Sequence, residues 1–102
     1  MPSSPTAFVR ENLVVNATKS RTVPSGAKWI ITNVVLSATG TTAATVTVLI
    51  DGVALIPGVS IPALGMFTLD CTQVVYAQSS VEVRNGANGA VSAHVSGVEV
   101  TP

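Results

Sequence analysis

The amino-acid sequence predicts an all-β protein, an antiparallel β-sandwich of jelly-roll type with an extended N-terminal arm. Three observations predict this fold class. The chain has eighteen valines and twelve threonines but four aromatic residues, and β-branched side chains favour the pleated surface of a sheet. Short runs of alternating apolar residues recur, with turn signals about every 8 to 12 residues. No segment shows the apolar spacing of a helix.

Length and composition limit the possible classes of protein. A chain of 102 residues fits one domain, because two halves would each have too small a core. Only 10% of the residues are charged and 47% are hydrophobic, which argues against disorder. No apolar run approaches the roughly 20 residues that cross a bilayer, and the N-terminus lacks the pattern of a secretory signal. We therefore expect a soluble chain with no membrane partner, whose weakly charged surface favours association.

The first residues differ in pattern from the rest of the chain. We expect residues 1–20 to form an N-terminal arm and residues 21–102 to form the β-sandwich domain. Pro2 and Pro5 disfavour regular structure at the tip. Two short apolar anchors follow within the arm, Phe8-Val9 and Leu13-Val14-Val15. Such anchors pack either on the arm's own sandwich or on that of a neighbour.

The segment after the Pro24-Ser25-Gly26 turn predicts a long central strand over residues 28–39. Both of its faces are mostly apolar, so we expect it to be covered on two sides. Strict alternation sorts its side chains into two sets. One set is Trp29, Ile31, Asn33 and Val35, and the other is Ile30, Thr32, Val34 and Leu36.

The middle of the chain predicts a hairpin followed by edge structure. Residues 44–50 alternate, and Asp51-Gly52 is the dipeptide that favours a two-residue type I′ turn into a return strand over 53–56. Prolines bracket the short run 59–61, which indicates a sheet edge. A further strand begins at residue 66 and continues to residue 75 after a bend.

The last third of the chain predicts two strands, over residues 81–84 and 90–101, joined by a loop over 85–89. In the final strand Val98 and Val100 are out of phase with the apolar residues before them, so we expect a bulge near Gly97. Jelly-roll connectivity is favoured over an immunoglobulin-like one, because the chain has no Cys…Trp…Cys pattern.

No group of residues indicates catalysis. His94 is the single histidine and Cys71 the single cysteine, and no motif marks a nucleophile, a phosphate-binding loop or a metal site. We expect an exposed or structural His94, an inert Cys71 thiol and a core position for Trp29. The prediction is a protein that is not an enzyme and that has no catalytic residues, no metal and no cofactor.

The charges are unevenly distributed. The first 28 residues carry a net charge of +3, and the remainder carries −3. Four basic residues without interleaved aromatics are weak support for nucleic-acid binding, so no nucleic-acid partner is expected. Opposite charge at the two ends of the chain instead favours docking between copies, although scattered surface charge is an equally simple interpretation.

Residues 21–101 resemble small β-sandwich virion proteins of tailed bacteriophages. The resemblance rests on the strand from Val23 to Leu36, the threonine-rich turn over 39–42, and the Asp51-Gly52 hairpin. It also rests on the Ile61-Pro62-Ala63 step and the terminal strand from Val91 to Thr101. It implies a virion location after assembly in the host cytoplasm. The implied role is a capsid decoration protein that binds the major capsid protein as a homo-oligomer, usually a trimer, and stabilises the shell.

Within this resemblance the arm is the expected attachment site. The residues expected to contact other subunits are Phe8, Val9, Arg10, Leu13 and Val14, with Lys19 and Arg21 meeting an acidic coat surface. Other interpretations stay open. They are a tail, collar or fibre structural protein, and a carbohydrate- or receptor-binding module, which would need exposed aromatic residues.

Overall fold

The computed structural model describes residues 3–101, and this part of the chain forms eight β-strands and no helix. The strands are β1 (Ser3–Leu13), β2 (Thr18–Thr22), β3 (Lys28–Ala38), β4 (Ala44–Ile50), β5 (Val53–Ile61), β6 (Met66–Val75), β7 (Ser80–Asn85) and β8 (Val91–Val100).

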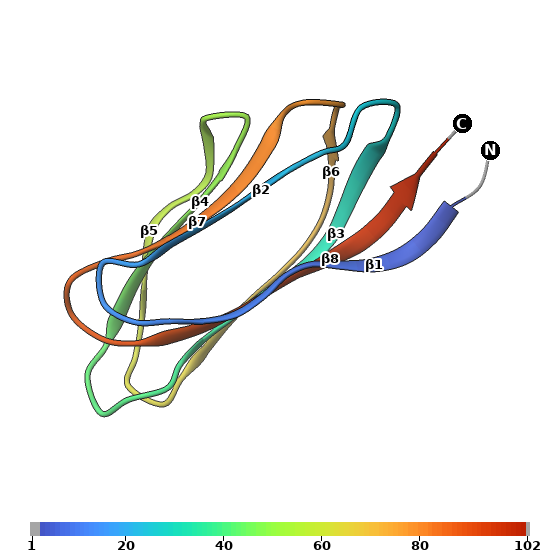
Figure 1. Ribbon diagram of the computed structural model, residues 1–102. Coiled ribbons are helices and arrows are strands. Elements are labelled where there is room, and N and C mark those ends of the chain that lie inside the picture. The colour runs from blue at the N-terminus through green and yellow to red at the C-terminus, as the bar shows by residue number, and fades with distance from the viewer. Residues whose placement is uncertain (1–2, 102) are drawn as a thin grey trace.

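Two four-stranded antiparallel sheets pack face to face (Figure 1). The strand order is β1-β8-β3-β6 in sheet A and β2-β7-β4-β5 in sheet B. This order pairs the first strand with the last, and the chain alternates between the two sheets except at the β4–β5 hairpin, as in an eight-stranded jelly roll. The predicted antiparallel β-sandwich of jelly-roll type is therefore confirmed.

The core lies between the sheets and consists mainly of β-branched side chains. Trp29, Phe8 and Ile31 are its largest fully buried members. Strand β3 lies between β8 and β6, as expected for a central strand. At the Asp51-Gly52 turn both residues have positive φ, 53° and 77°, as a type I′ turn requires. The predicted hairpin is confirmed, and β5 continues through Pro57 as an edge strand.

The N-terminal segment is part of the sandwich. Strand β1 pairs with β8 from Ser3 to Leu13, and β2 pairs with β7. The expected boundary at residue 20 falls inside β2 and separates no structural units. The physical reason is that Phe8, Val9 and Leu13 fill the chain's own core, so the chain gains more from burying them than from leaving an arm in solvent. Residues 1 and 2 of the expected arm lie outside the described residues.

The bulge predicted near Gly97 lies instead in the two strands beside β8. The pairing shifts between Ala7 and Val9 in β1 and between Ile31 and Asn33 in β3, whereas β8 keeps a regular alternation. Glycine is required at position 97, beside these register shifts, because a Cβ there would overlap the carbonyl oxygen of Ile30. The extra residue Thr32 also overturns the expected division of β3 into two faces.

The inward side chains of β3 are Trp29, Ile31, Val34, Leu36 and Ala38. The regular alternation of β8 decides which way the side chains of its last residues point. Val95, Gly97 and Glu99 fall on the inner face, so Val98 and Val100 fall on the outer face of sheet A. The phase of these two valines, which indicated a bulge, instead reflects half-buried apolar side chains on the outer face of sheet A.

Candidate assembly surface

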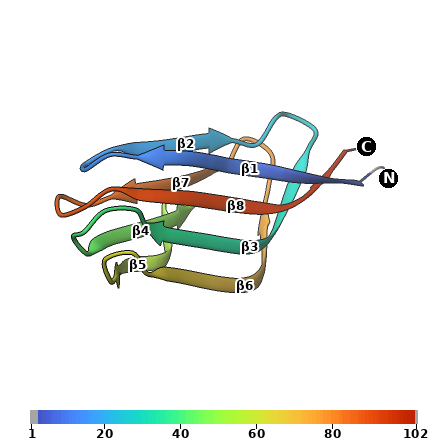
Figure 2. The ribbon, with the colours of Figure 1, turned by 90° about the horizontal axis from the view of Figure 1, so that it is seen from below.

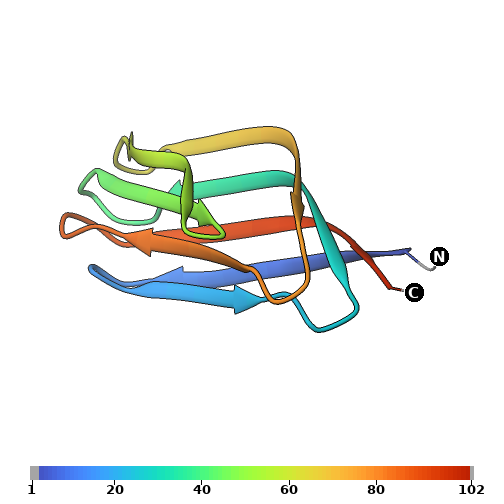
Figure 3. The same ribbon diagram turned by 90° about the horizontal axis from the view of Figure 1, so that it is seen from above.

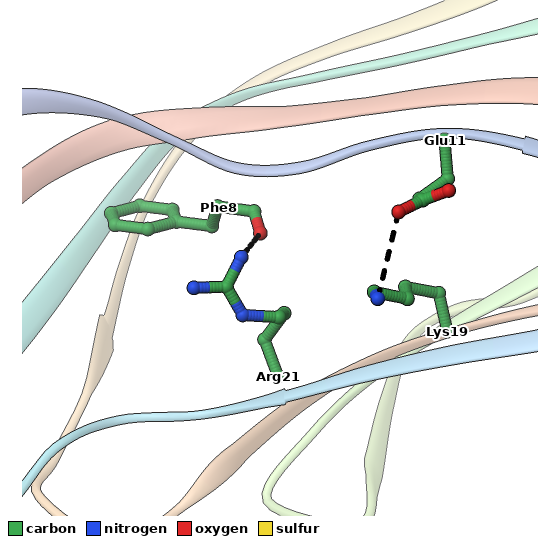
Figure 4. Close-up of polar contacts among 4 residues, drawn as sticks. All are labelled: Phe8, Glu11, Lys19 and Arg21. Carbon is green, nitrogen blue, oxygen red and sulfur yellow. Dashed lines mark hydrogen bonds and ion pairs between the residues drawn. The ribbon is translucent and has the colours of Figure 1, made fainter.

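Strands β1 and β2 form one edge of the sandwich, and β5 and β6 form the other (Figure 2; Figure 3). The β1/β2 edge is closed by a cross-sheet cluster around Trp29. The Phe8 ring stacks on the Trp29 ring with centroids 4.4 Å apart, and the guanidinium of Arg21 lies 5.8 Å from the Trp29 centroid. Figure 4 shows that Arg21 Nη1 also donates to the carbonyl oxygen of Phe8 at 2.8 Å. Trp29 Nε1 donates to Glu99 Oε2 at 2.9 Å.

This cluster explains the position of Arg21. Its charge is engaged by an aromatic face and a backbone carbonyl across the gap between the two sheets. A cation over an indole ring contributes about 0.5–1 kcal/mol at a partly exposed site. Arg21 therefore links β2 to β1 and β3 and shields the edge of Trp29 from solvent.

The other charged residues of this edge divide into a pair and a single cation. Lys19 Nζ lies 3.5 Å from Glu11 Oε1 (Figure 4), with both side chains about two-fifths exposed. Such a pair contributes at most about 1 kcal/mol. Arg10 lies on the outer face of sheet A, opposite His94 in the register, and its side chain is exposed. Unlike Lys19 and Arg21, Arg10 has no ion-pair or hydrogen-bond partner among the described residues.

The seven residues expected to contact other subunits thus separate into three groups. Phe8, Val9 and Leu13 are at most 6% exposed, so in this fold they stabilise the sandwich and present no surface. Lys19 and Arg21 are engaged within the chain. Arg10 and Val14, the latter 68% exposed, are the two that remain open to a partner.

The β5/β6 edge differs from the β1/β2 edge because several of its apolar side chains are only partly buried. Ile56, Ile61 and Val75 belong to the core, whereas a second set packs against the core and stays partly exposed, namely Leu55, Val59, Phe67, Leu69 and Cys71. A hollow of about 160 Å³ opens beside them, lined by Ile50, Val53, Ala54, Leu55 and Gln73.

Exposed apolar side chains gather around the same edge. Val53 is 71% exposed, Leu64 75% and Met66 65%, and Val74 and Tyr76 add to them at the end of β6. Neither β5 nor β6 contains a lysine or arginine. Asp70 of β6 accepts a hydrogen bond from Asn33 Nδ2 at 2.8 Å, a neutral donor that leaves its negative charge uncompensated.

Edge strands usually avoid such exposure, because an unpaired apolar strand is a template for association. Sequence reasoning missed this surface. The available signal was the run from Met66 to Val75, which has one charged residue in ten positions.

The outer faces of the two sheets also differ. In sheet A the register aligns Pro5, Val98, Ile30 and Val74 across all four strands, which forms an apolar row on the side away from the core. Sheet B instead presents hydroxyl groups and the Arg84–Glu82 pair at 2.7 Å. Thr18 of β2, paired with Arg84, and Thr47 of β4 are typical of this face.

The residues considered for chemistry are dispersed. His94 is exposed on the outer face of sheet A. Burial raises the pKa of the Cys71 thiol, and the nearby Asp70 charge raises it further, so Cys71 is less ionised than an ordinary cysteine. Residues 3–101 contain no group of three or more histidine, cysteine, aspartate or glutamate side chains that could hold a metal ion. The same residues include no helix long and apolar enough to span a membrane.

Neither a family model nor a curated protein matches the sequence. Solved structures with the same fold do exist. The Drosophila NLP core, whose structure was described as providing insight into pentamer formation and histone binding, aligns with a TM-score of 0.55 at 17% identity, covering 94% of this chain and 100% of that one. A chain of infectious bursal disease virus, Gx strain, aligns with a TM-score of 0.50 at 14% identity, covering 96% of this chain and 31% of that one.

At these identities the similarity establishes the fold and nothing finer. The jelly roll is shared with a chain of a virus and with the core of a protein described as forming a pentamer. The present chain spans about a third of the viral chain that it matches.

Proposed function

We propose that this chain is a structural protein of a virion, a capsid decoration protein that binds the coat lattice as a homo-oligomer and stabilises the shell. The observation that carries the proposal is the gathering of exposed and partly buried apolar side chains along the β5/β6 edge of a small jelly roll. A protein with such an edge and few surface charges gains free energy by covering it with another chain. The sequence resemblance to tailed-phage virion proteins over residues 21–101 supports the capsid as the place of assembly.

The proposed mechanism is additive. Each oligomer contacts several coat subunits at once, so that modest interfaces act together and the second contact forms at high effective concentration. Repetition over the shell then resists outward pressure from packaged nucleic acid. The major capsid protein is the proposed partner of the oligomer, and Arg10 and Val14 are the residues of the N-terminal segment that are exposed enough to contact another subunit.

The structure weakens the carbohydrate-binding alternative. A sugar platform requires an exposed aromatic ring, and Trp29 is 2% exposed beneath Arg21. Tyr76, 66% exposed, is left as an isolated ring after β6. A tail or collar position shares the same assembly physics and is separated from the capsid by the experiment below.

The test is co-sedimentation of the purified chain with empty capsid shells of the virus that encodes it, prepared from a mutant lacking the gene. We expect the chain to pellet with the shells, and we expect shells that carry it to withstand higher temperature before they open. Purified tails from the same mutant serve as the comparison. A chain that ignores shells and binds tails would place it on the tail instead, and binding to neither would refute a virion role.

A further inference from the structure

The two edges of the sandwich are complementary in the properties that govern docking. The β1/β2 edge has three basic residues and one acidic residue, whereas β5, β6 and the turns beside them have Asp51 and Asp70 and no basic residue. Complementary charge guides association and fixes its register. One edge is closed by Arg21 and the other is open and apolar. Two identical edges therefore do not meet favourably, because they would bring like charges together.

The complementary groups also lie at matching heights along the strands. Arg10 pairs with His94, which in turn pairs with Val35, and Val35 pairs with Thr68. Arg10 and Thr68 therefore lie at the same height along the strands. Asp70 lies one row from Thr68 on the same outer face of sheet A. A rotation about an axis parallel to the strands keeps every residue at its height, so it would bring Arg10 of one copy diagonally opposite Asp70 of the next, within reach of long side chains.

The apolar groups match in the same way. Asn12 pairs with Ser92, Ser92 with Ser37, and Ser37 with Met66, so Asn12 and Met66 lie at the same height. Val14 follows just beyond Asn12 on the first edge, and Leu64 just beyond Met66 on the second. Val14 and Leu64 are 68% and 75% exposed, so contact between copies would remove both from water.

We propose that the β1/β2 edge of one copy docks against the β5/β6 edge of the next, which produces a closed head-to-tail ring. The occupant of the open edge is thus a second copy of this chain. A contact between two different patches repeats until the rotation closes, so three or more copies are required. This inference rests on the proposed function only in its premise that the chain self-associates, and the capsid need not be the partner.

The experiment measures the molar mass of the full chain by light scattering over a wide range of concentration, for the native sequence and five variants. The native chain is expected to show the molar mass of three or more copies, each of 10.3 kDa. Leu64→Lys, Arg10→Asp and Asp70→Arg are each expected to shift the mass toward one copy. Arg10→Asp combined with Asp70→Arg restores opposite charges at each contact and is expected to restore the ring. Since all three side chains are exposed, folding is preserved and is checked by circular dichroism.

His94→Lys is the matched control. His94 is exposed and pairs with Arg10, but it lies on β8, one strand inside the β1 edge, and does not itself border a neighbouring edge, so the mass should not change. A native mass of one or two copies would overturn the ring. Loss of the ring in His94→Lys with no effect of Leu64→Lys would overturn the edge contact in favour of face-to-face packing. Capsid binding is measured separately. A chain that forms the ring but does not bind capsids refutes the proposed function alone. A chain that binds capsids but whose mass is unchanged by the edge substitutions refutes this inference alone.

Discussion

Gly97 determines how closely β8 can approach β3. A side chain at this position would overlap the carbonyl oxygen of Ile30, close to the point where β3 has the extra residue Thr32. The backbone of a central strand has little room to move aside, because both of its edges are paired.

Gly97→Ala is therefore expected to lower the free energy of unfolding by about 1–3 kcal/mol, the typical cost of overpacking. Urea denaturation measures the change. Gly40→Ala is the control, because a Cβ at residue 40 meets no atom within 4 Å and its effect should stay within about 0.5 kcal/mol. Equal effects of the two substitutions would contradict the close approach.

Arg21 is expected to protect Trp29 from solvent. Arg21→Ala removes the guanidinium over the indole and the hydrogen bond to Phe8, at a cost of about 1–2 kcal/mol. It should also shift the tryptophan emission to longer wavelength, because the ring edge becomes wet. Arg84→Ala, which breaks only the surface pair with Glu82, should change neither quantity appreciably. An unshifted emission spectrum in Arg21→Ala would show that other groups cover the ring.

Asn85 is the buried polar side chain that joins β7 to the end of β1. Its Nδ2 lies 3.1, 3.0 and 2.8 Å from the carbonyl oxygens of Leu13, Val14 and Gly89. Asn85→Ala leaves these buried acceptors without a donor and should cost about 1–3 kcal/mol. Asn12→Ala, at an exposed position, provides the control in the same thermal melts. A melting temperature lowered equally by both would mean that the hydrogen bonds contribute little.

At the scale of elements, β1 is a structural strand of the sandwich and not a separate arm. It pairs along its length with β8 and supplies Phe8, Val9 and Leu13 to the core. Burial of three such side chains contributes roughly 1.5–3 kcal/mol each, which is comparable with the whole stability of a small domain.

A chain that begins at residue 14 is therefore expected to lose its cooperative thermal transition. Circular dichroism and the dispersion of amide resonances measure the loss. A chain that begins at residue 5 keeps all three core side chains and should melt as the full chain does. A folded product from the longer truncation would show that the first thirteen residues behave as a removable arm.

At the scale of the whole molecule, the open β5/β6 edge can be followed through Cys71. The thiol is partly buried on β6 and its pKa is raised by burial and by Asp70, so the alkylation rate should rise at higher pH than for a free cysteine. The proposed ring would cover this edge, so alkylation should be slower in the native chain than in the Leu64→Lys variant at the same pH. Equal rates in the two would show that assembly leaves β6 exposed.

The amount of structure predictable from sequence varies with the range of the interaction. The Asp51-Gly52 hairpin and the strand over 44–50 were predicted correctly, because a type I′ turn and period-two alternation are local properties of the backbone. The fate of Phe8 and Val9 was not, since either the chain's own sheets or a neighbour's can bury an apolar anchor. Of the residues expected to contact other subunits, Arg10 and Val14 are exposed, and their role stays a prediction; the apolar β5/β6 surface depends on distant packing and was not predicted.

The sequence by itself determined that this chain forms paired strands around a valine-rich core, because β-branched alternation and turn residues act within a few positions of each other. Only the tertiary structure decided which strands become edges and which edge is closed. That choice depends on contacts between distant residues, such as Arg21 with Trp29 and Asn85 with Leu13. At the β1/β2 edge Arg21 spans the gap between the sheets, whereas at the β5/β6 edge Leu55, Phe67 and Leu69 remain only partly buried.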